Sequence, residues 1–171
     1  MNVLVIDGYN VIARGLATNP KRDMADEDAR RGHREELVRL AKRLCSGKKG
    51  LEVRIYFDGS AERSAPELSD RSVKVFFAKG DQGADNAIIK FCRAHPKPKD
   101  IEVASDDFST LVFHIRSHVG RILTVAEVMR RLNAGGASQG SQASSKAKDK
   151  EPLSDGTRQS INQTLPSSWF R

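Results

Sequence analysis

The feature that most constrains this chain is its first apolar run, Val3 to Ile6, which leads directly into Asp7 and Gly8. Four consecutive apolar residues predict a strand that is buried on both faces of a parallel sheet. The aspartate then stands at the carboxyl end of this strand, where open α/β sheets bind their ligands. Gly8 lets the chain turn there without a Cβ clash, and Asn10 brings an amide back toward the same place. We therefore expect a polar site at this edge of the sheet.

Strands and helices alternate in the following part of the chain. Further strands are predicted over residues 53–57, 73–77, 101–104 and 120–123. Amphipathic helices are predicted over about residues 26–45, from near Asp85 to 94, over about 108–115, and after Thr124. The pair Asn19-Pro20 is expected to end a short element that follows Asn10. This alternation predicts an α/β fold with a central parallel sheet of about five strands and helices on both faces.

The composition changes after residue 133. Ala, Gly, Ser, Gln and Lys dominate from 134 to about 152 without a helical or strand period, which is typical of a disordered segment. We therefore expect one folded domain over residues 1–133 and a low-complexity, disordered tail over residues 134–171. The formal net charge of +7 permits a polyanion as partner without requiring one. No apolar stretch approaches the roughly 20 residues of a membrane span, so we expect a cytoplasmic protein with no membrane contact.

Two later segments bring further carboxylates to the edge where Asp7 stands. Asp85 opens a predicted helix, and Asp106 and Asp107 follow the predicted strand over 101–104. Each of them could serve only as a helix cap, but together with Asp7 they make a set of oxygen ligands that hard divalent ions prefer. Because neighbouring side chains diverge, we expect Asp106 to face the site and Asp107 to act as an outer or water-mediated ligand. The set predicts a Mg²⁺ or Mn²⁺ site and phosphodiester chemistry.

A resemblance to a known family rests on these same segments. Val5-Ile6-Asp7-Gly8-Tyr9-Asn10-Val11-Ile12 resembles the opening motif of the YacP-like nucleases, members of the NYN group in the PIN-like superfamily. Gly83-Ala84-Asp85 and Val103-Ala104-Ser105-Asp106 resemble the segments that carry the family's second and third acids. Tyr56-Phe57-Asp58 resembles its second strand, and residues 120–127 resemble its last strand and helix. The resemblance covers about residues 1–133.

This resemblance implies a Rossmann-like PIN fold and metal-dependent endoribonuclease activity on RNA. It implies that Asp7, Asp85 and Asp106 form the acidic core and that Asn10 supports it. It also implies the ribosome as a partner to test, because the best-studied branch of the family is associated with mRNA cleavage there. The chain departs from the family pattern at Asn86 and Asp107, which leaves the number of metal ions open.

Contacts with RNA are expected from side chains near the predicted edge of the sheet. The basic residues Arg14, Lys79, Lys90 and Arg116 are candidates for phosphate contacts, which position a substrate without selecting its sequence. Tyr9 is the aromatic side chain best placed to stack on a base.

Three other functions fit part of the pattern. A non-catalytic RNA- or ribosome-binding module would keep the same fold without turnover, although the trio of Asp7, Asp85 and Asp106 favours catalysis. A haloacid dehalogenase phosphatase also starts with a strand and an aspartate, but it needs a second aspartate where this chain has Tyr9. A DNA flap nuclease would be expected to carry more acids and a DNA-binding helical element. The sequence therefore predicts a metal-dependent endoribonuclease ahead of these alternatives.

Overall fold

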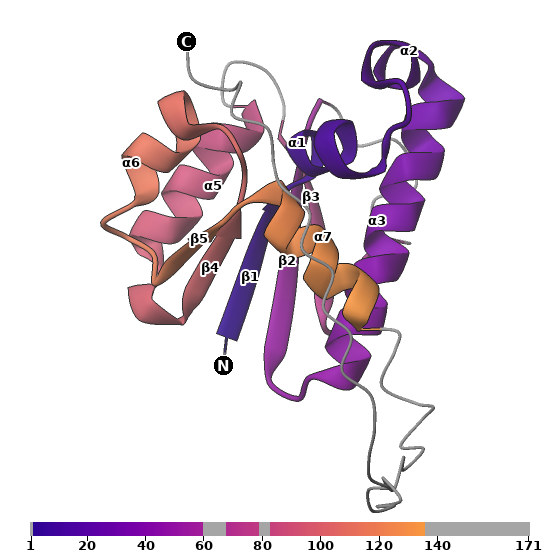
Figure 1. The fold of residues 1–171 in the computed structure, drawn as a ribbon. Coiled ribbons are helices and arrows are strands. Elements are labelled where there is room, and N and C mark those ends of the chain that lie inside the picture. Colours follow the sequence, from indigo (N-terminus) through magenta and orange to yellow (C-terminus); the bar gives the residue numbers. More distant parts are fainter. Residues whose placement is uncertain (1, 60–67, 79–82, 136–171) are drawn as a thin grey trace, which may run out of the picture. The chain divides into compact units, whose positions relative to one another are not determined.

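Five parallel strands form the centre of the structure (Figure 1). This computed structural model describes residues 2–59, 68–78 and 83–135. The strands are β1 (Asn2–Asp7), β2 (Leu51–Asp58), β3 (Val73–Ala78), β4 (Ile101–Ala104) and β5 (Arg121–Leu123). They lie in the order β3-β2-β1-β4-β5, and every pairing between them is parallel. The predicted α/β fold with a five-stranded parallel sheet is therefore confirmed.

The order of the strands changes direction at β1. The chain adds β2 and β3 on one side of β1 and then returns to add β4 and β5 on the other side. As a result β1 and β4 are hydrogen-bonded neighbours, with Ile6 paired with Ala104. A reversal of this kind opens a crevice at the carboxyl ends of the strands, where α/β proteins bind ligands. Asp7 is the last residue of β1 and therefore stands at this crevice.

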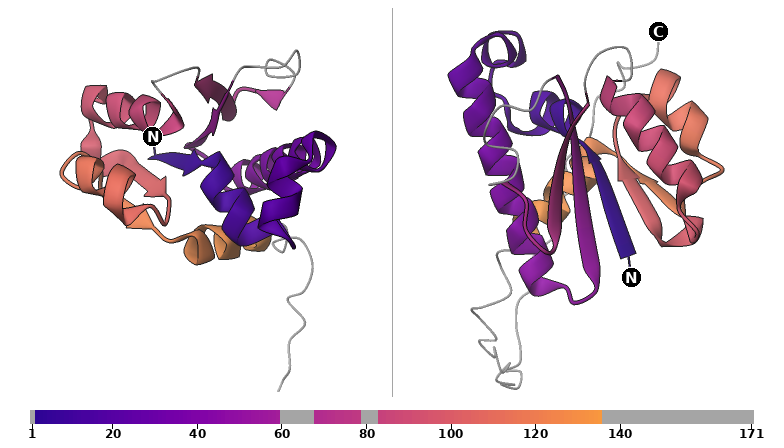
Figure 2. Two further views of the ribbon diagram at one scale, coloured as in Figure 1. Left: turned by 90° about the horizontal axis from the view of Figure 1, so that it is seen from above. Right: turned by 180° about the vertical axis from the view of Figure 1, so that it is seen from behind.

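Helices cover both faces of the sheet (Figure 2). One face carries α1 (Gly8–Val11), α3 (Glu27–Gly47) and α7 (Val125–Ala134), and the other carries α5 (Gly83–Ala94) and α6 (Phe113–Ile115). The remaining elements are a π-helical turn η1 (Ile12–Leu16), α2 (Pro20–Ala25), a 3-10 turn η3 (Pro98–Asp100) and a π-helical turn η4 (Phe108–Val112). The layers are therefore helix, sheet and helix, as the alternation in the sequence predicts.

The apolar side chains of β1 alternate between two hydrophobic cores. Leu4 and Ile6 pack with residues of α3 and α7, whereas Val3 and Val5 pack with residues of α5, η4 and α6. Successive side chains of a strand point to opposite faces of the sheet, so an unbroken apolar run fills both cores. Each of the four side chains is at most 5% exposed, and its burial contributes roughly 1.5–3 kcal/mol. The position of Asp7 is therefore held from both sides of the sheet.

The segment between α1 and α3 differs from the prediction. The sequence predicts that Asn19-Pro20 ends a short element, but these residues begin α2. The side chain of Asn19 accepts a hydrogen bond from the N–H of Arg22 at 3.3 Å, and Pro20 lies in the first turn, where its missing N–H costs nothing. The prediction was wrong because the same pair of residues is compatible with either end of a helix.

The described ranges contain no helix that is long and apolar enough to cross a membrane. Residues 136–171, which make up nearly all of the predicted tail, lie outside the described residues, and so does Lys79.

Candidate active site

Asp7 is the most deeply buried carboxylate of the candidate site. Its side chain is 7% exposed, and it also caps α1. Oδ1 accepts a hydrogen bond from the N–H of Asn10 at 3.4 Å, and Oδ2 accepts one from Oγ of Ser105 at 3.1 Å. Burial raises the pKa of Asp7 to about 6, the charges of Asp85 and Asp58 add to the rise, and the two hydrogen bonds oppose it. Burial at this position thus favours the protonated form of the carboxyl group more than water does.

Ser105 is a member of the site that was not among the site residues predicted from the sequence. It follows β4 directly and is completely buried. Its hydroxyl donates to Asp7 and accepts a hydrogen bond from the N–H of Asp107 at 3.1 Å. One buried hydroxyl therefore ties the end of β1 to the loop after β4, although 98 residues separate Ser105 from Asp7.

Asn10 makes a second link between the same two loops. Its side-chain oxygen accepts a hydrogen bond from the N–H of Asp106 at 3.0 Å. The side chain of Asp106 is turned toward α7, because Oδ1 accepts the N–H of Val125 at 3.0 Å and Oδ2 lies 3.8 Å from Nη1 of Arg14. The side-chain amide of Asn10 therefore lies at the site, where it contacts the backbone of Asp106. The carboxylate of Asp106 accepts the first N–H of α7.

Asp107 lies near enough to Asp85 for its charge to act on that carboxyl group. The charge of Asp107 raises the pKa of Asp85, after burial, which is the larger cause. The N–H of Thr110, together with the hydroxyls of Ser109 and Thr110, holds the pKa of Asp107 below its usual range. The sequence prediction assigns the inner position to Asp106 and the outer one to Asp107. In the structure the charge of Asp107 raises the pKa of Asp85, while the carboxylate of Asp106 bonds to α7. Which of the two would face a metal ion stays a prediction.

Asp58 is a fifth carboxylate at this edge, and it was not among the site residues predicted from the sequence. It ends β2, and its Oδ1 accepts the N–H of Ala84 at 2.6 Å, which fixes the start of α5. Gly83 precedes that N–H with a φ of +43°, and a Cβ there would lie 3.2 Å from Oδ1 of Asp58. The charge of Asp58 raises the pKa values of both Asp7 and Asp85. The order strand, Asp, Gly occurs at Asp7 and again at Asp58, and this repeat is the signal in the sequence from which Asp58 could have been assigned to the site.

We call Asp7, Asp58, Asp85 and Asp107 the acidic cluster. Next to it lies a cleft of about 450 Å³, lined by Asp58, Gly83, Asp85, Asn86, Ile89, Arg93, Thr110 and His114. Arg93 follows Asp85 by eight residues of α5, which corresponds to about 12 Å along a helix axis. The cleft therefore combines carboxylates from one end of α5 with a cationic side chain from the other. In the described part of the chain, no three His, Cys, Asp or Glu side chains form a group that could hold a metal ion.

The residues predicted to contact RNA lie in different surroundings. Arg14 is exposed beside Asp106, Lys90 is exposed on α5, and Arg116 is exposed directly after α6. Tyr9 is half-buried: its ring lies 5.0 Å from that of Phe57, and its hydroxyl accepts a hydrogen bond from Arg34 at 2.9 Å. Tyr9 thus packs against the core, a role that the sequence did not predict, and its stacking on a base stays a prediction.

The sequence model of the YacP-like NYN domain matches residues 4–169. The chain belongs to this family. The family assignment made from the motif around Asp7 is therefore confirmed, and with it a nuclease-type fold.

Two crystal structures of Rae1 (YacP) from Bacillus subtilis are similar to this chain, with 22% sequence identity and a TM-score of 0.60. In both comparisons 80% of this chain is covered, together with 76% of the unmodified Rae1 chain and 78% of a tryptophan-to-leucine mutant. At this identity the likeness establishes the fold alone. None of the curated proteins matches the chain.

Proposed function

We propose that this protein is a metal-dependent endoribonuclease that hydrolyses RNA phosphodiester bonds at the acidic cluster. The observation that carries the proposal is the gathering of four carboxylates at the crevice, where their charges and burial raise the pKa values of Asp7 and Asp85. Like charges held together in a partly buried site are unfavourable unless a cation compensates for them. Membership of the YacP-like NYN family supports a nuclease.

The donor atoms of the acidic cluster fit a hard divalent ion. Asp7, Asp58 and Asp85 offer carboxylate oxygens, and Mg²⁺ is commonly held by only one or two carboxylates together with several waters. Such an ion therefore does not require three side chains in direct contact with it. When bound, Mg²⁺ or Mn²⁺ would lower the pKa of a bound water and stabilise negative charge on the phosphate oxygens.

The residues around the cluster hold its carboxylates in place. Ser105 occupies one oxygen of Asp7 with a hydrogen bond of 3.1 Å, whereas the contact of the other oxygen with Asn10 is long, at 3.4 Å. Oδ1 of Asp7 is therefore the oxygen better able to accept a further ligand. Asp107 is held by its own loop, so that its charge stays next to Asp85. Positioning by fixed hydrogen bonds of this kind is what phosphoryl chemistry requires of a protein.

The test is cleavage of a mixed-sequence single-stranded RNA in Mg²⁺ or Mn²⁺. We expect cleavage by the wild type and its loss in EDTA, in Asp7→Asn and in Asp85→Asn. Asp28→Asn is the matched control, because Asp28 is an exposed carboxylate on α3 that pairs with Arg31. If Asp85→Asn cleaves RNA at the wild-type rate, the acidic cluster is not the catalytic site.

A non-catalytic RNA- or ribosome-binding module is the second candidate. The observation that favours it is the exposure of basic side chains such as Arg14 and Arg116, which could contact RNA phosphates without any metal ion. Calorimetric titration with Mn²⁺ separates the two functions, because only the nuclease requires the metal. An absence of cleavage with free RNA would call for the same assay with translating ribosomes. Cleavage there that depends on Asp7 would identify an enzyme acting on ribosome-held message, and binding without cleavage would identify the module.

A further inference from the structure

Two phenylalanine side chains of the η4–α6 segment are exposed to solvent. Phe108 is 58% exposed and Phe113 is 60% exposed, and they are the exposed large hydrophobic side chains of the described part of the chain. The same segment is anchored firmly, since Leu111 and Ile115 are completely buried in the core beneath α5. Aromatic residues are enriched at binding interfaces, and a well-anchored segment holds them in a fixed position for a partner.

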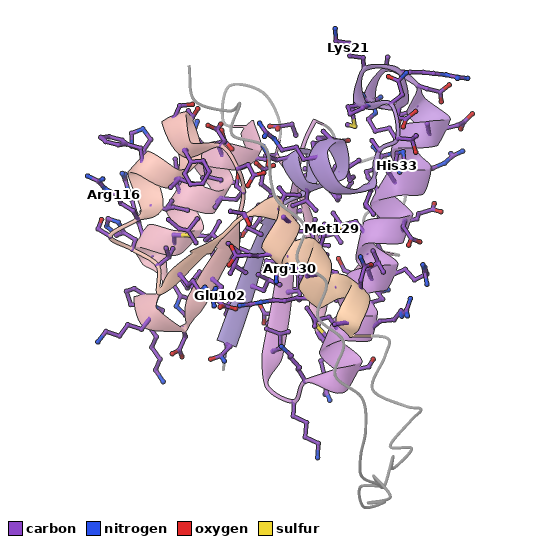
Figure 3. The ribbon with its side chains drawn as sticks, in the orientation of Figure 1. Lys21, His33, Glu102, Arg116, Met129 and Arg130 are labelled. Carbon is purple, nitrogen blue, oxygen red and sulfur yellow. The ribbon has the colours of Figure 1, made fainter. Side chains whose placement is uncertain are left out.

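The groups around Phe113 indicate what kind of partner this surface suits. The guanidinium of Arg116 lies 5.3 Å from the centre of the Phe113 ring, and the His114 ring meets it edge-on at 5.5 Å. Arg116 extends from the α6 side of the molecule into solvent (Figure 3). An aromatic face beside a cation is the combination that binds single-stranded nucleic acid, because bases stack on the ring and phosphates pair with the charge. A purely apolar partner would gain nothing from the neighbouring charge.

This surface is continuous with the cleft at the acidic cluster. His114 contacts the ring of Phe113 and also lines the cleft, opposite Arg93 of α5. Asp58 and Asp85 line the same cleft. The 12 Å or so of α5 between Asp85 and Arg93 correspond to roughly 3 nucleotides of a stacked strand. A strand lying in the cleft with its bond at the carboxylates would therefore reach Arg93 after a few nucleotides. His114 lines the same cleft and connects it to the ring of Phe113.

We propose that Arg93, Phe113, His114 and Arg116, which we call the aromatic platform, bind single-stranded RNA next to the bond that is cleaved. One unpaired base stacks on Phe113, and the flanking phosphates lie near Arg93 and Arg116. The inference rests on the proposed nuclease function and adds the substrate class to it: the RNA is unpaired beside the cleavage point. Bases inside a duplex are already stacked and paired, so a duplex does not satisfy the platform.

Binding is measured by fluorescence anisotropy with a short labelled RNA in EDTA, so that no cleavage occurs. We expect Phe113→Ala to weaken binding of the single strand by roughly 5- to 100-fold, which is the usual effect of losing one stacked base. Phe113→Trp keeps a stacking surface and should bind like the wild type. Phe113→Ala should have little effect on the same RNA annealed to its complement.

The charge is tested by salt dependence. Arg116→Gln should reduce the slope of log Kd against log salt concentration by about 0.7, the value for one phosphate contact with a single strand. Arg130→Gln is the matched control, because Arg130 is an exposed arginine on α7, on the other face of the sheet (Figure 3). We expect Arg130→Gln to leave the slope unchanged.

Three results would overturn the inference. The first is binding of the single strand by Phe113→Ala within twofold of the wild type. The second is an equal loss of affinity for the single strand and the duplex. The third is a marked fall in the thermal midpoint of the full-length Phe113→Ala variant, which would show that another part of the chain covers the ring. Phe113-dependent binding without cleavage, both of free RNA and of RNA on translating ribosomes, would instead refute the nuclease and leave the platform in place. Cleavage that depends on Asp85 but not on Phe113 would do the reverse.

Discussion

Replacing Asp7 with asparagine should make the protein more stable at neutral pH in the absence of metal. The pKa of Asp7 rises from 3.8 to about 6 on folding, chiefly through burial. Each pKa unit corresponds to about 1.4 kcal/mol, so the ionised carboxylate destabilises the folded state by about 3 kcal/mol. Asparagine is neutral and avoids this penalty. Its amide group replaces the oxygen that accepts the hydrogen bond of Ser105, which costs about 1 kcal/mol. The net expected gain is about 2 kcal/mol.

The raised pKa of Asp7 also determines how the stability difference between the wild type and Asp7→Asn changes with pH. Because the folded pKa of Asp7 is the higher one, the folded protein binds more protons than the unfolded chain between about pH 4 and pH 6. The contribution of Asp7 to the free energy of unfolding is therefore retained at low pH and lost as the pH rises through this window. The advantage of Asp7→Asn should be present at about pH 7 and absent at about pH 4.

The assay is urea denaturation of the wild type and Asp7→Asn in EDTA at both pH values, followed by circular dichroism. Asp28→Asn again serves as the control, since its carboxylate is exposed on α3 and should show no such crossover. If Asp7→Asn proves less stable than the wild type at neutral pH, the ionised carboxylate of Asp7 does not destabilise the folded state. The account of the acidic cluster would then be wrong.

Three further predictions concern metal binding, the two adjacent aspartates after β4, and the packing of Gly8. Mg²⁺ or Mn²⁺ should raise the thermal midpoint of the wild type, because a ligand that binds only the folded state stabilises it. The rise should be smaller for Asp85→Asn. Equal rises in the two proteins would show that the metal binds elsewhere. Asp107→Asn should slow cleavage more than Asp106→Asn, because an asparagine at 106 can still accept the first N–H of α7. A greater loss of rate in Asp106→Asn would show that Asp106 is the carboxylate nearer the metal. Gly8→Ala should lower the free energy of unfolding by about 1–3 kcal/mol in urea denaturation, because the added Cβ would lie 2.3 Å from the Phe57 ring. An unchanged free energy of unfolding would contradict the close packing of Gly8 against Phe57.

The candidate site was predictable wherever it depends on local pattern. Asp7 follows a strand that fills two cores, and the sequence shows both the apolar run and its end. Asp85 lies in the first turn of α5, where the sequence places it. Asp58 was missed although its strand, Asp, Gly order repeats that of Asp7, because a carboxylate after a strand is equally typical of a simple turn.

The contacts that organise the site were not predictable in this way. Which of Asp106 and Asp107 faces Asp85 depends on the first N–H of α7, which captures Asp106, and on the turn of the η4 loop, which holds Asp107. The role of Ser105 depends on Asp7, a residue 98 positions away. Local periodicity contains no information on such partners, because they meet only when the loops of two neighbouring strands are brought together.

The sequence alone determined the family, the alternation of strands and helices, and the strand end at which Asp7 stands, because each of these is written in short-range patterns of apolar, polar and glycine residues. The tertiary structure decided which carboxylates interact and that Tyr9 packs on Phe57 instead of facing solvent. It also decided that Phe113 lies exposed beside the cleft. The direction of a side chain at the end of a strand depends on the groups that surround it, and those groups come from elements far away in the sequence.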